Sequence, residues 1–125
     1  MAVKLFDSEL KVMDVLWKEG DMPAKQISDI LKETTGWNMN TTYTVIKKCI
    51  AKGAVERREP NFLCHALIAR DVVQAAETEE LLRKLFDSSP DLMFASLLGH
   101  QKLSKAQIEN LRRMVSVLQA QEERE

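Results

Sequence analysis

Apolar residues near the start of the chain recur at steps of three and four, which is the period of an amphipathic helix. The pattern predicts a first helix over residues 8–19, with Ser8 as its N-cap and Gly20 at its end. It predicts a second helix over residues 23–34, which ends before Gly36. Each of these helices is expected to carry one apolar stripe.

A third helix is predicted over residues 40–52, with Asn40 as its N-cap. The residues that follow alternate weakly over 54–58 and then turn at 59–61, where Pro and Asn favour chain reversal. A second strand is predicted over 62–68. A short hairpin directly after a pair of helices is the arrangement of a winged helix-turn-helix.

Three further helices are predicted over residues 70–87, 91–98 and 104–121. Ser104 is the expected N-cap of the last helix, and Gln107 completes a capping box with it. The apolar residues of this helix step by three, four and three, which is a heptad seam formed by Ile108, Leu111, Val115 and Leu118.

These elements predict a mainly α fold with a small β-hairpin, divided into two domains. Residues 1–69 are expected to form a winged helix-turn-helix DNA-binding domain, and residues 70–125 a helical dimerisation domain. The second domain is too short to bury much apolar surface alone, and an identical chain is its simplest partner. The residues expected in the dimer core are Leu81, Leu85, Leu92, Leu97, Leu98, Ile108, Leu111, Val115 and Leu118.

The composition is that of an ordinary globular protein, since 45% of the 125 residues are apolar and 30% are charged. No apolar run approaches the roughly 20 residues of a membrane span. Asp7 comes too early in the chain for the core of a signal peptide. We therefore expect a cytoplasmic protein with no membrane insertion. The two cysteines are too few for a disulfide framework.

The net charge of −1 hides a local basic stretch, because residues 40–70 carry six basic and only two acidic side chains. Such a stretch suits double-stranded DNA, whose phosphates attract charge locally and whose major groove admits a helix. The predicted contacts are Asn40, Thr41, Thr42, Thr44, Lys47 and Lys48 on the third helix, with Arg57 and Arg58 on the hairpin. From the residues alone, a plain solvated helix face beside an edge hairpin is the alternative.

Chemistry of other kinds finds little support along the chain. There is no nucleophile–base pair, phosphate-loop glycine pattern or zinc-helix motif, so we expect no enzyme activity and no cofactor. Cys64 and His65 are neighbours on a strand and point to opposite faces, so they cannot hold one metal ion together. Cys49 falls on the apolar face of the third helix and is expected in the core. The alternative function is a helical adaptor that binds only protein, which would not need the basic cluster.

Three motifs occur in a fixed order along the chain. Residues 9–17 read ELKVMDVLW, residues 36–46 read GWNMNTTYTVI, and residues 52–55 read KGAV. A short apolar helix follows, and Leu103-Ser104 opens the last helix. In this combination the chain resembles the penicillinase and methicillin-resistance repressor family from Phe6 to Leu118.

The resemblance implies a bacterial transcriptional repressor that binds an inverted-repeat operator as a homodimer and controls β-lactam resistance genes. It implies the same helix and hairpin contacts as the charge pattern. Thr42 stands where the family usually has Val, whereas Thr44 matches the family pattern. Lys48 stands where Arg is common, which would weaken a bidentate contact and change the preferred operator.

The resemblance also implies a route of release. In the better-known branch a membrane sensor protease cuts the repressor at an Asn-Phe bond in its short C-terminal helix. The equivalent bond here is Ser96-Leu97, which departs from that pattern. Residues 94–98 are therefore better interpreted as plain dimer core, and cleavage there is the alternative. The copper-responsive branch carries a C-x-C pair near the C-terminus, but the last cysteine here is Cys64, so that mechanism is unsupported.

Overall fold

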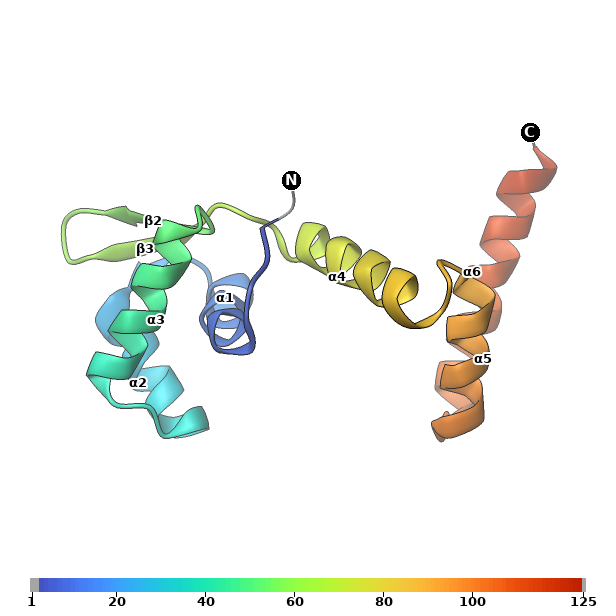
Figure 1. The fold of residues 1–125 in the computed structure, drawn as a ribbon, viewed down its shortest axis with the longest axis horizontal. Helices are drawn as coiled ribbons and strands as arrows, with labels where there is room; N and C mark the ends of the chain where they lie inside the picture. Colours follow the sequence, from blue (N-terminus) through green and yellow to red (C-terminus); the bar gives the residue numbers. More distant parts are fainter. Residues whose placement is uncertain (1–2, 125) are drawn as a thin grey trace. The chain divides into compact units, whose positions relative to one another are not determined.

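The computed structural model describes residues 3–124, which divide into two compact units after Glu79. The fold is mainly helical with one small antiparallel sheet, as predicted (Figure 1). In chain order the elements are α1 (Asp7–Glu19), β1 (Met22–Pro23), α2 (Ala24–Thr35), α3 (Met39–Ala51), β2 (Val55–Arg58), β3 (Leu63–Ala66), α4 (Arg70–Leu85), α5 (Pro90–His100) and α6 (Lys105–Glu123).

The sheet has three strands in the order β1-β3-β2, and all neighbours are antiparallel. Strands β2 and β3 are the predicted hairpin, with Val55 opposite Ala66. Strand β1 was not predicted, since the two residues Met22 and Pro23 are too few to show an alternating pattern. It lies at the edge of the sheet, where a proline is tolerated, and it places Met22 opposite Cys64.

Two helix starts differ from the sequence prediction because other side chains cap them. Helix α1 begins at Asp7, since the Glu9 carboxylate accepts a hydrogen bond from the Phe6 N–H at 2.7 Å. Helix α3 begins after Asn38, whose Oδ1 accepts from the Thr41 N–H at 2.8 Å, so Asn40 lies in the first turn rather than at the cap. The capping box at the start of α6 is present as predicted.

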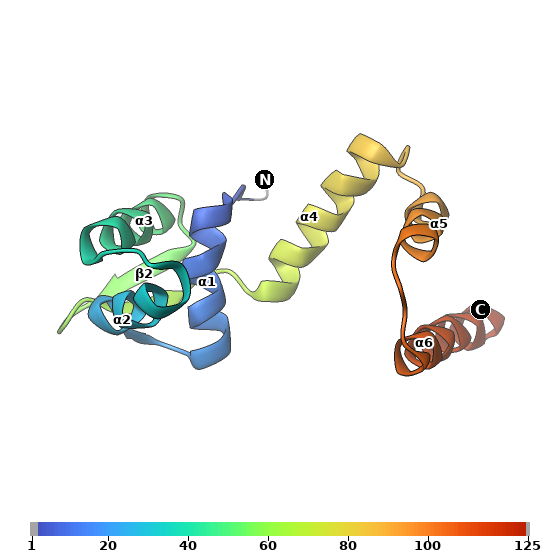
Figure 2. The same cartoon turned by 90° about the horizontal axis from the view of Figure 1, so that it is seen from below.

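The core of the first unit lies where α1, α2 and α3 pack against one another (Figure 2). Strand β3 packs against α1, and β2 packs against α3. Met13 of α1, Ile27 of α2 and Ile46 of α3 have no exposed surface. Trp17 packs at the edge of this core, and its indole N–H donates to the Ile68 carbonyl at 2.9 Å. Burial of these apolar side chains supplies most of the free energy that holds α3 in place.

The second unit contains the end of α4 together with α5 and α6. No described residue of α5 or α6 is buried. Apolar side chains of both helices line an open groove of about 710 Å³. No described helix is both long enough and apolar enough to span a lipid bilayer.

Candidate nucleic-acid interface

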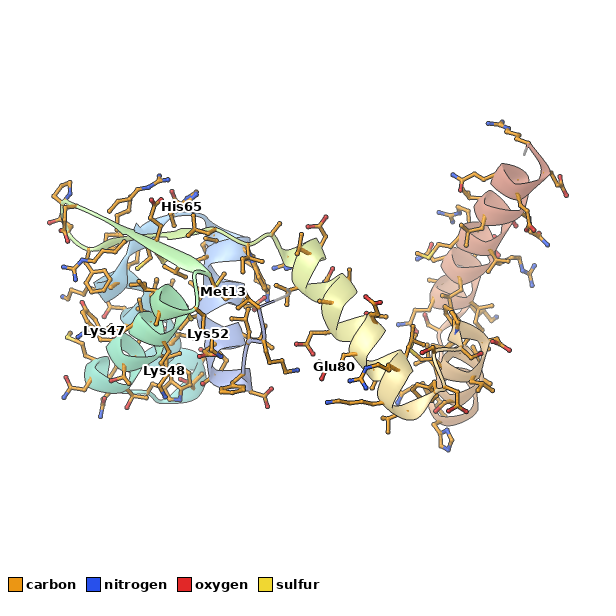
Figure 3. All side chains as sticks on the ribbon, turned by 45° about the horizontal axis from the view of Figure 1, so that its top comes forward. Met13, Lys47, Lys48, Lys52, His65 and Glu80 are labelled. Atoms are coloured by element: carbon orange, nitrogen blue, oxygen red, sulfur yellow. The ribbon has the colours of Figure 1, made fainter. Side chains whose placement is uncertain are left out.

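Helix α3 has one face in the core and one face in solvent. Five of the six predicted contacts on this helix are exposed: Asn40, Thr41, Thr44, Lys47 and Lys48. Their spacing places them on one side of the helix, with the polar residues near the N-terminus and the lysines further along. Figure 3 labels Lys47 and Lys48 on α3. The structure thus gathers these five side chains into one surface, which we name the α3 face.

Thr42 does not belong to this surface. Its side chain is 0% exposed and shares the core side of α3 with Val45, Ile46 and Cys49. Its hydroxyl oxygen has no hydrogen-bond partner among the described residues. The prediction that it contacts DNA is therefore corrected: the helical period turns this position inward. The valine that the resembled family carries here was the sequence signal for a core position.

The basic residues near α3 fall into two groups. Lys47 and Lys48 form no ion pair with any described residue, so their charges stay directed to solvent. Lys52 is different, because its ammonium lies 2.6 Å from the Glu9 carboxylate and donates to the Lys4 carbonyl at 2.7 Å. It also lies 3.9 Å from the centre of the Phe6 ring. Lys52 therefore fixes the end of α3 to the start of α1 and does not extend the α3 face.

The partner of Lys52 is a carboxylate in the core. Glu9 is only 1% exposed. Burial raises the pKa of this carboxyl and is the largest single influence on it. Hydrogen bonds from Lys52 and the Phe6 N–H, with the charges of Lys52 and Lys48, together outweigh burial and lower the pKa of Glu9 below its ordinary value of 4.5. Glu9 is thus held as an anion that Lys52 must neutralise.

The hairpin arginines are exposed but already paired. Arg57 donates from Nε to Glu59 at 2.6 Å, and this contact lowers the pKa of the Glu59 carboxyl. Arg58 pairs with Glu56 at 2.9 Å and lies 4.0 Å from Asp21. Exposed pairs of this kind contribute little to stability. A DNA phosphate could therefore displace either carboxylate at small cost.

The cysteines and histidines form no metal site among residues 3–124. Cys64 is buried, whereas His65 on the opposite face lies 2.9 Å from an Asp21 oxygen, as the strand alternation predicts. Cys49 is buried in the core, as expected. Burial raises the pKa of Cys49 to about 12 and that of Cys64 to about 11, so both thiols stay protonated at neutral pH.

The residues predicted for the dimer core lie in solvent in the single chain. Leu111 is half-buried, and the others are exposed. Two further exposed apolar residues of α6, Met114 and Val117, were not predicted, whereas Phe94 of α5 lies in the segment 94–98 already expected to suit a dimer core. Phe94 and Met114 line the same groove as Ile108 and Leu118. Their exposure extends the apolar surface that a partner would cover.

The candidate cleavage bond Ser96-Leu97 lies inside α5. Leu97 is exposed and Ser96 is half-buried, and the Ser96 carbonyl lies 3.0 Å from His100 Nδ1. A protease that binds its substrate as an extended strand would have to unwind this part of the helix first.

The comparisons with known proteins all indicate the same kind of protein. The family model described as "Penicillinase repressor" matches residues 5–117. A penicillinase repressor of Bacillus licheniformis is 24% identical over 110 residues, which is 86% of each chain.

Two solved structures resemble the first unit. The solution structure of the DNA-binding domain of the repressor BlaI is 26% identical, with a TM-score of 0.53 over 58% of this chain and 90% of that one. The Bacillus licheniformis BlaI monomeric form, solved in complex with the blaP half-operator, is 27% identical, with a TM-score of 0.50 over 55% of this chain and 87% of that one.

Proposed function

The chain belongs to the penicillinase repressor family, and from this premise we propose that it represses transcription as a homodimer bound to an inverted-repeat DNA operator. Repressors of this kind are not a class of enzyme, and they act on DNA, so we place the protein in the cytoplasm. The observation that carries the proposal is the α3 face, where five polar and basic side chains share one exposed side of a helix whose other side is anchored in the core.

The α3 face suits a DNA major groove by size and chemistry. Asn40, Thr41 and Thr44 lie near the N-terminus of the helix, where hydroxyl and amide groups can hydrogen-bond base edges. Lys47 and Lys48 both lie about one turn beyond Thr44 and supply charge without first breaking an ion pair. Arg57 and Arg58 of the hairpin are proposed to grip the flanking phosphates.

The second unit supplies the dimer in this proposal. Its exposed apolar residues include Leu92, Leu98, Ile108, Val115 and Leu118. A patch of this kind marks a surface that a partner covers. A two-fold dimer would present two copies of α3 to successive major grooves about 34 Å apart. An operator with inverted half-sites one helical turn apart is the expected consequence.

Release by proteolysis is a separate proposal that rests on the family. A cut at Ser96-Leu97 would divide α5 and remove part of the surface that forms the dimer. Incubation with a membrane sensor protease of the same organism, followed by mass spectrometry, tests it. A fragment that ends at Ser96 supports this route, and an intact chain after induction supports α5 as dimer core alone.

Selection of bound sequences from a random DNA pool tests the proposed function, run with the purified chain at two salt concentrations. An enriched inverted repeat, bound more weakly at high salt, is the expected result, because phosphate contacts release counterions. No enrichment together with salt-insensitive behaviour would contradict it and favour a helical adaptor that binds only protein.

A single substitution then separates the two kinds of contact. Lys48→Met is expected to weaken binding of all sequences about equally if Lys48 contacts phosphate, and to relax the preference at one base pair if it contacts a base edge. Lys84→Met is the matched control, since Lys84 is an exposed lysine of α4 that pairs with Glu80 outside the first unit.

A further inference from the structure

The turn of the hairpin contains a backbone conformation that its sequence does not favour. Asn61 and Phe62 have φ angles of 68° and 53°, both in the left-handed region. Asparagine adopts this region readily, but a bulky side chain such as Phe does so only under strain. Such a residue persists where surrounding contacts fix it, and strained residues cluster at functional sites. The contacts that hold Phe62 in this conformation are therefore candidates for a functional role.

Phe62 joins the hairpin to two helices. Its carbonyl accepts from the Ala24 N–H at the start of α2 at 2.9 Å. Its ring lies edge-to-face against Tyr43 of α3, with centroids 5.6 Å apart and planes 75° apart. Its own N–H donates to Glu59 at 3.4 Å. Tyr43 sits between the buried Thr42 and the exposed Thr44, so the ring contact ties the hairpin directly to the helix that carries the α3 face.

The Phe62 ring also contacts a cation. The Arg57 guanidinium carbon lies 3.7 Å from the ring centre. Glu59 holds the Nε edge of this guanidinium at 2.6 Å and is its one hydrogen-bond partner among the described residues. An arginine stacked on a ring keeps its in-plane donors, so the two terminal nitrogens can still meet a phosphate.

We propose that Phe62 is a positioning residue for DNA binding, which sets Arg57 at a fixed distance from the α3 face through Tyr43. This inference rests on the proposed function. A free arginine side chain loses much rotamer entropy when it binds. Holding the guanidinium between a ring and a carboxylate before DNA arrives removes part of that cost. The same contacts also determine which DNA phosphate Arg57 reaches while α3 lies in the major groove.

A double-mutant cycle on the full chain tests this coupling. The variants are Arg57→Ala, Phe62→Leu and both together, and Lys84→Ala controls for loss of one charge elsewhere. The probe is a pool of random-sequence duplexes of about 30 base pairs, long enough for two half-sites. Anisotropy measures the affinity across a salt series.

We expect Arg57→Ala to weaken binding about tenfold and to reduce the salt slope by about two, because each of the two subunits loses one phosphate contact. Phe62→Leu should weaken DNA binding by most of the same factor. In the double variant, adding Arg57→Ala to Phe62→Leu should weaken DNA binding little further. Phe62→Tyr, which keeps the ring, should restore the affinity. Additive effects in the cycle overturn the inference alone, whereas a wild-type chain that binds no DNA overturns the proposed function with it.

A second readout does not depend on DNA. In the wild-type chain the Arg57 Nε–H resonance should be shifted upfield by the ring current of Phe62. The shift should vanish in Phe62→Leu and remain in Phe62→Tyr, at unchanged helix content. An Arg57 resonance that is the same in all three proteins would show that the guanidinium does not rest on the ring, and would overturn the inference.

Discussion

The two units of the chain differ in whether their apolar residues are buried or exposed. Among residues 3–124, all buried hydrophobic residues lie between Leu5 and Val73, within the first unit. Helix α5 is rich in leucine and apolar on all sides, yet none of its described residues is buried. A helix that is apolar all round normally lies inside a core. The first unit therefore completes its own core, whereas the second unit leaves its apolar residues exposed.

The same contrast extends to charge. In the first unit Lys52, Arg57 and Arg58 have ion-pair partners, whereas Lys47 and Lys48 on the α3 face have none among the described residues. The second unit presents leucine, valine and isoleucine instead. This contrast is the one expected if the first unit binds DNA and the second unit binds a second copy of the chain, as proposed above.

The largest expected effect comes from a charge in the apolar surface of the second unit. Leu111→Asp places a carboxylate in the groove of α5 and α6. The chain should sediment as a monomer, and its affinity for a full operator should fall roughly hundredfold or more, because the two half-sites are no longer bound by one linked particle.

Asn110→Asp is the matched control for that change, since it adds the same charge at an exposed neighbouring position. It should leave the dimer and the affinity nearly unchanged. A monomeric Leu111→Asp protein that still binds the full operator tightly would refute the link between dimerisation and DNA binding.

A smaller effect is expected at the buried ion pair of the first unit. Lys52→Met leaves the Glu9 carboxylate in the core without its cation, which should lower the free energy of unfolding at pH 7 by about 2 kcal/mol. This value is at the low end for a broken pair because the Lys52 side chain is 28% exposed. Lys47→Met, which removes an unpaired exposed lysine of α3, is the control.

The pH dependence of that variant gives a sharper test. In the wild-type chain the pKa of Glu9 is lowered, so its contribution to stability is present above pH 4.5 and is lost as the pH falls through the folded-state pKa. In Lys52→Met burial dominates and should raise this pKa, so stability is recovered as the pH falls. Urea unfolding between pH 3 and 7 measures both, and parallel curves would contradict the assignment.

The smallest expected effect is a gain in the stability of the first unit. Thr42→Val replaces a buried hydroxyl without a partner by a methyl group, which should stabilise the first unit by about 1 kcal/mol and leave DNA affinity unchanged. Thr44→Val makes the same chemical change on the exposed side, where the hydroxyl donates to the Asn40 carbonyl. It should weaken DNA binding with little change in thermal stability. The opposite pattern would return Thr42 to the interface.

The sequence predicted the element order well, because apolar periodicity and capping residues act locally. It missed strand β1, which exists only through its pairing with β3. It placed the α3 N-cap at Asn40, because two asparagines stand close together and only the hydrogen bond to Thr41 selects Asn38. These are features that tertiary contacts decide.

For the candidate site, the sequence predicted which residue types are present better than it predicted which of them are exposed. Five of the six α3 residues do share one face. Thr42 was included because its hydroxyl can hydrogen-bond DNA, although the helical period places it on the core side. The pairing of Lys52 with Glu9 joins residues 43 positions apart, and no local pattern shows it. The roles of the exposed residues in DNA contact stay predictions.

Amide hydrogen exchange of the full chain, measured over a wide range of protein concentration with mass spectrometry, tests the contrast between the two units most directly. Protection in α1, α2 and α3 should not depend on concentration, whereas protection in α5 and α6 should rise as dimers form. If α5 and α6 were protected as strongly as α1, α2 and α3 at concentrations where the chain sediments as a monomer, the account would be contradicted.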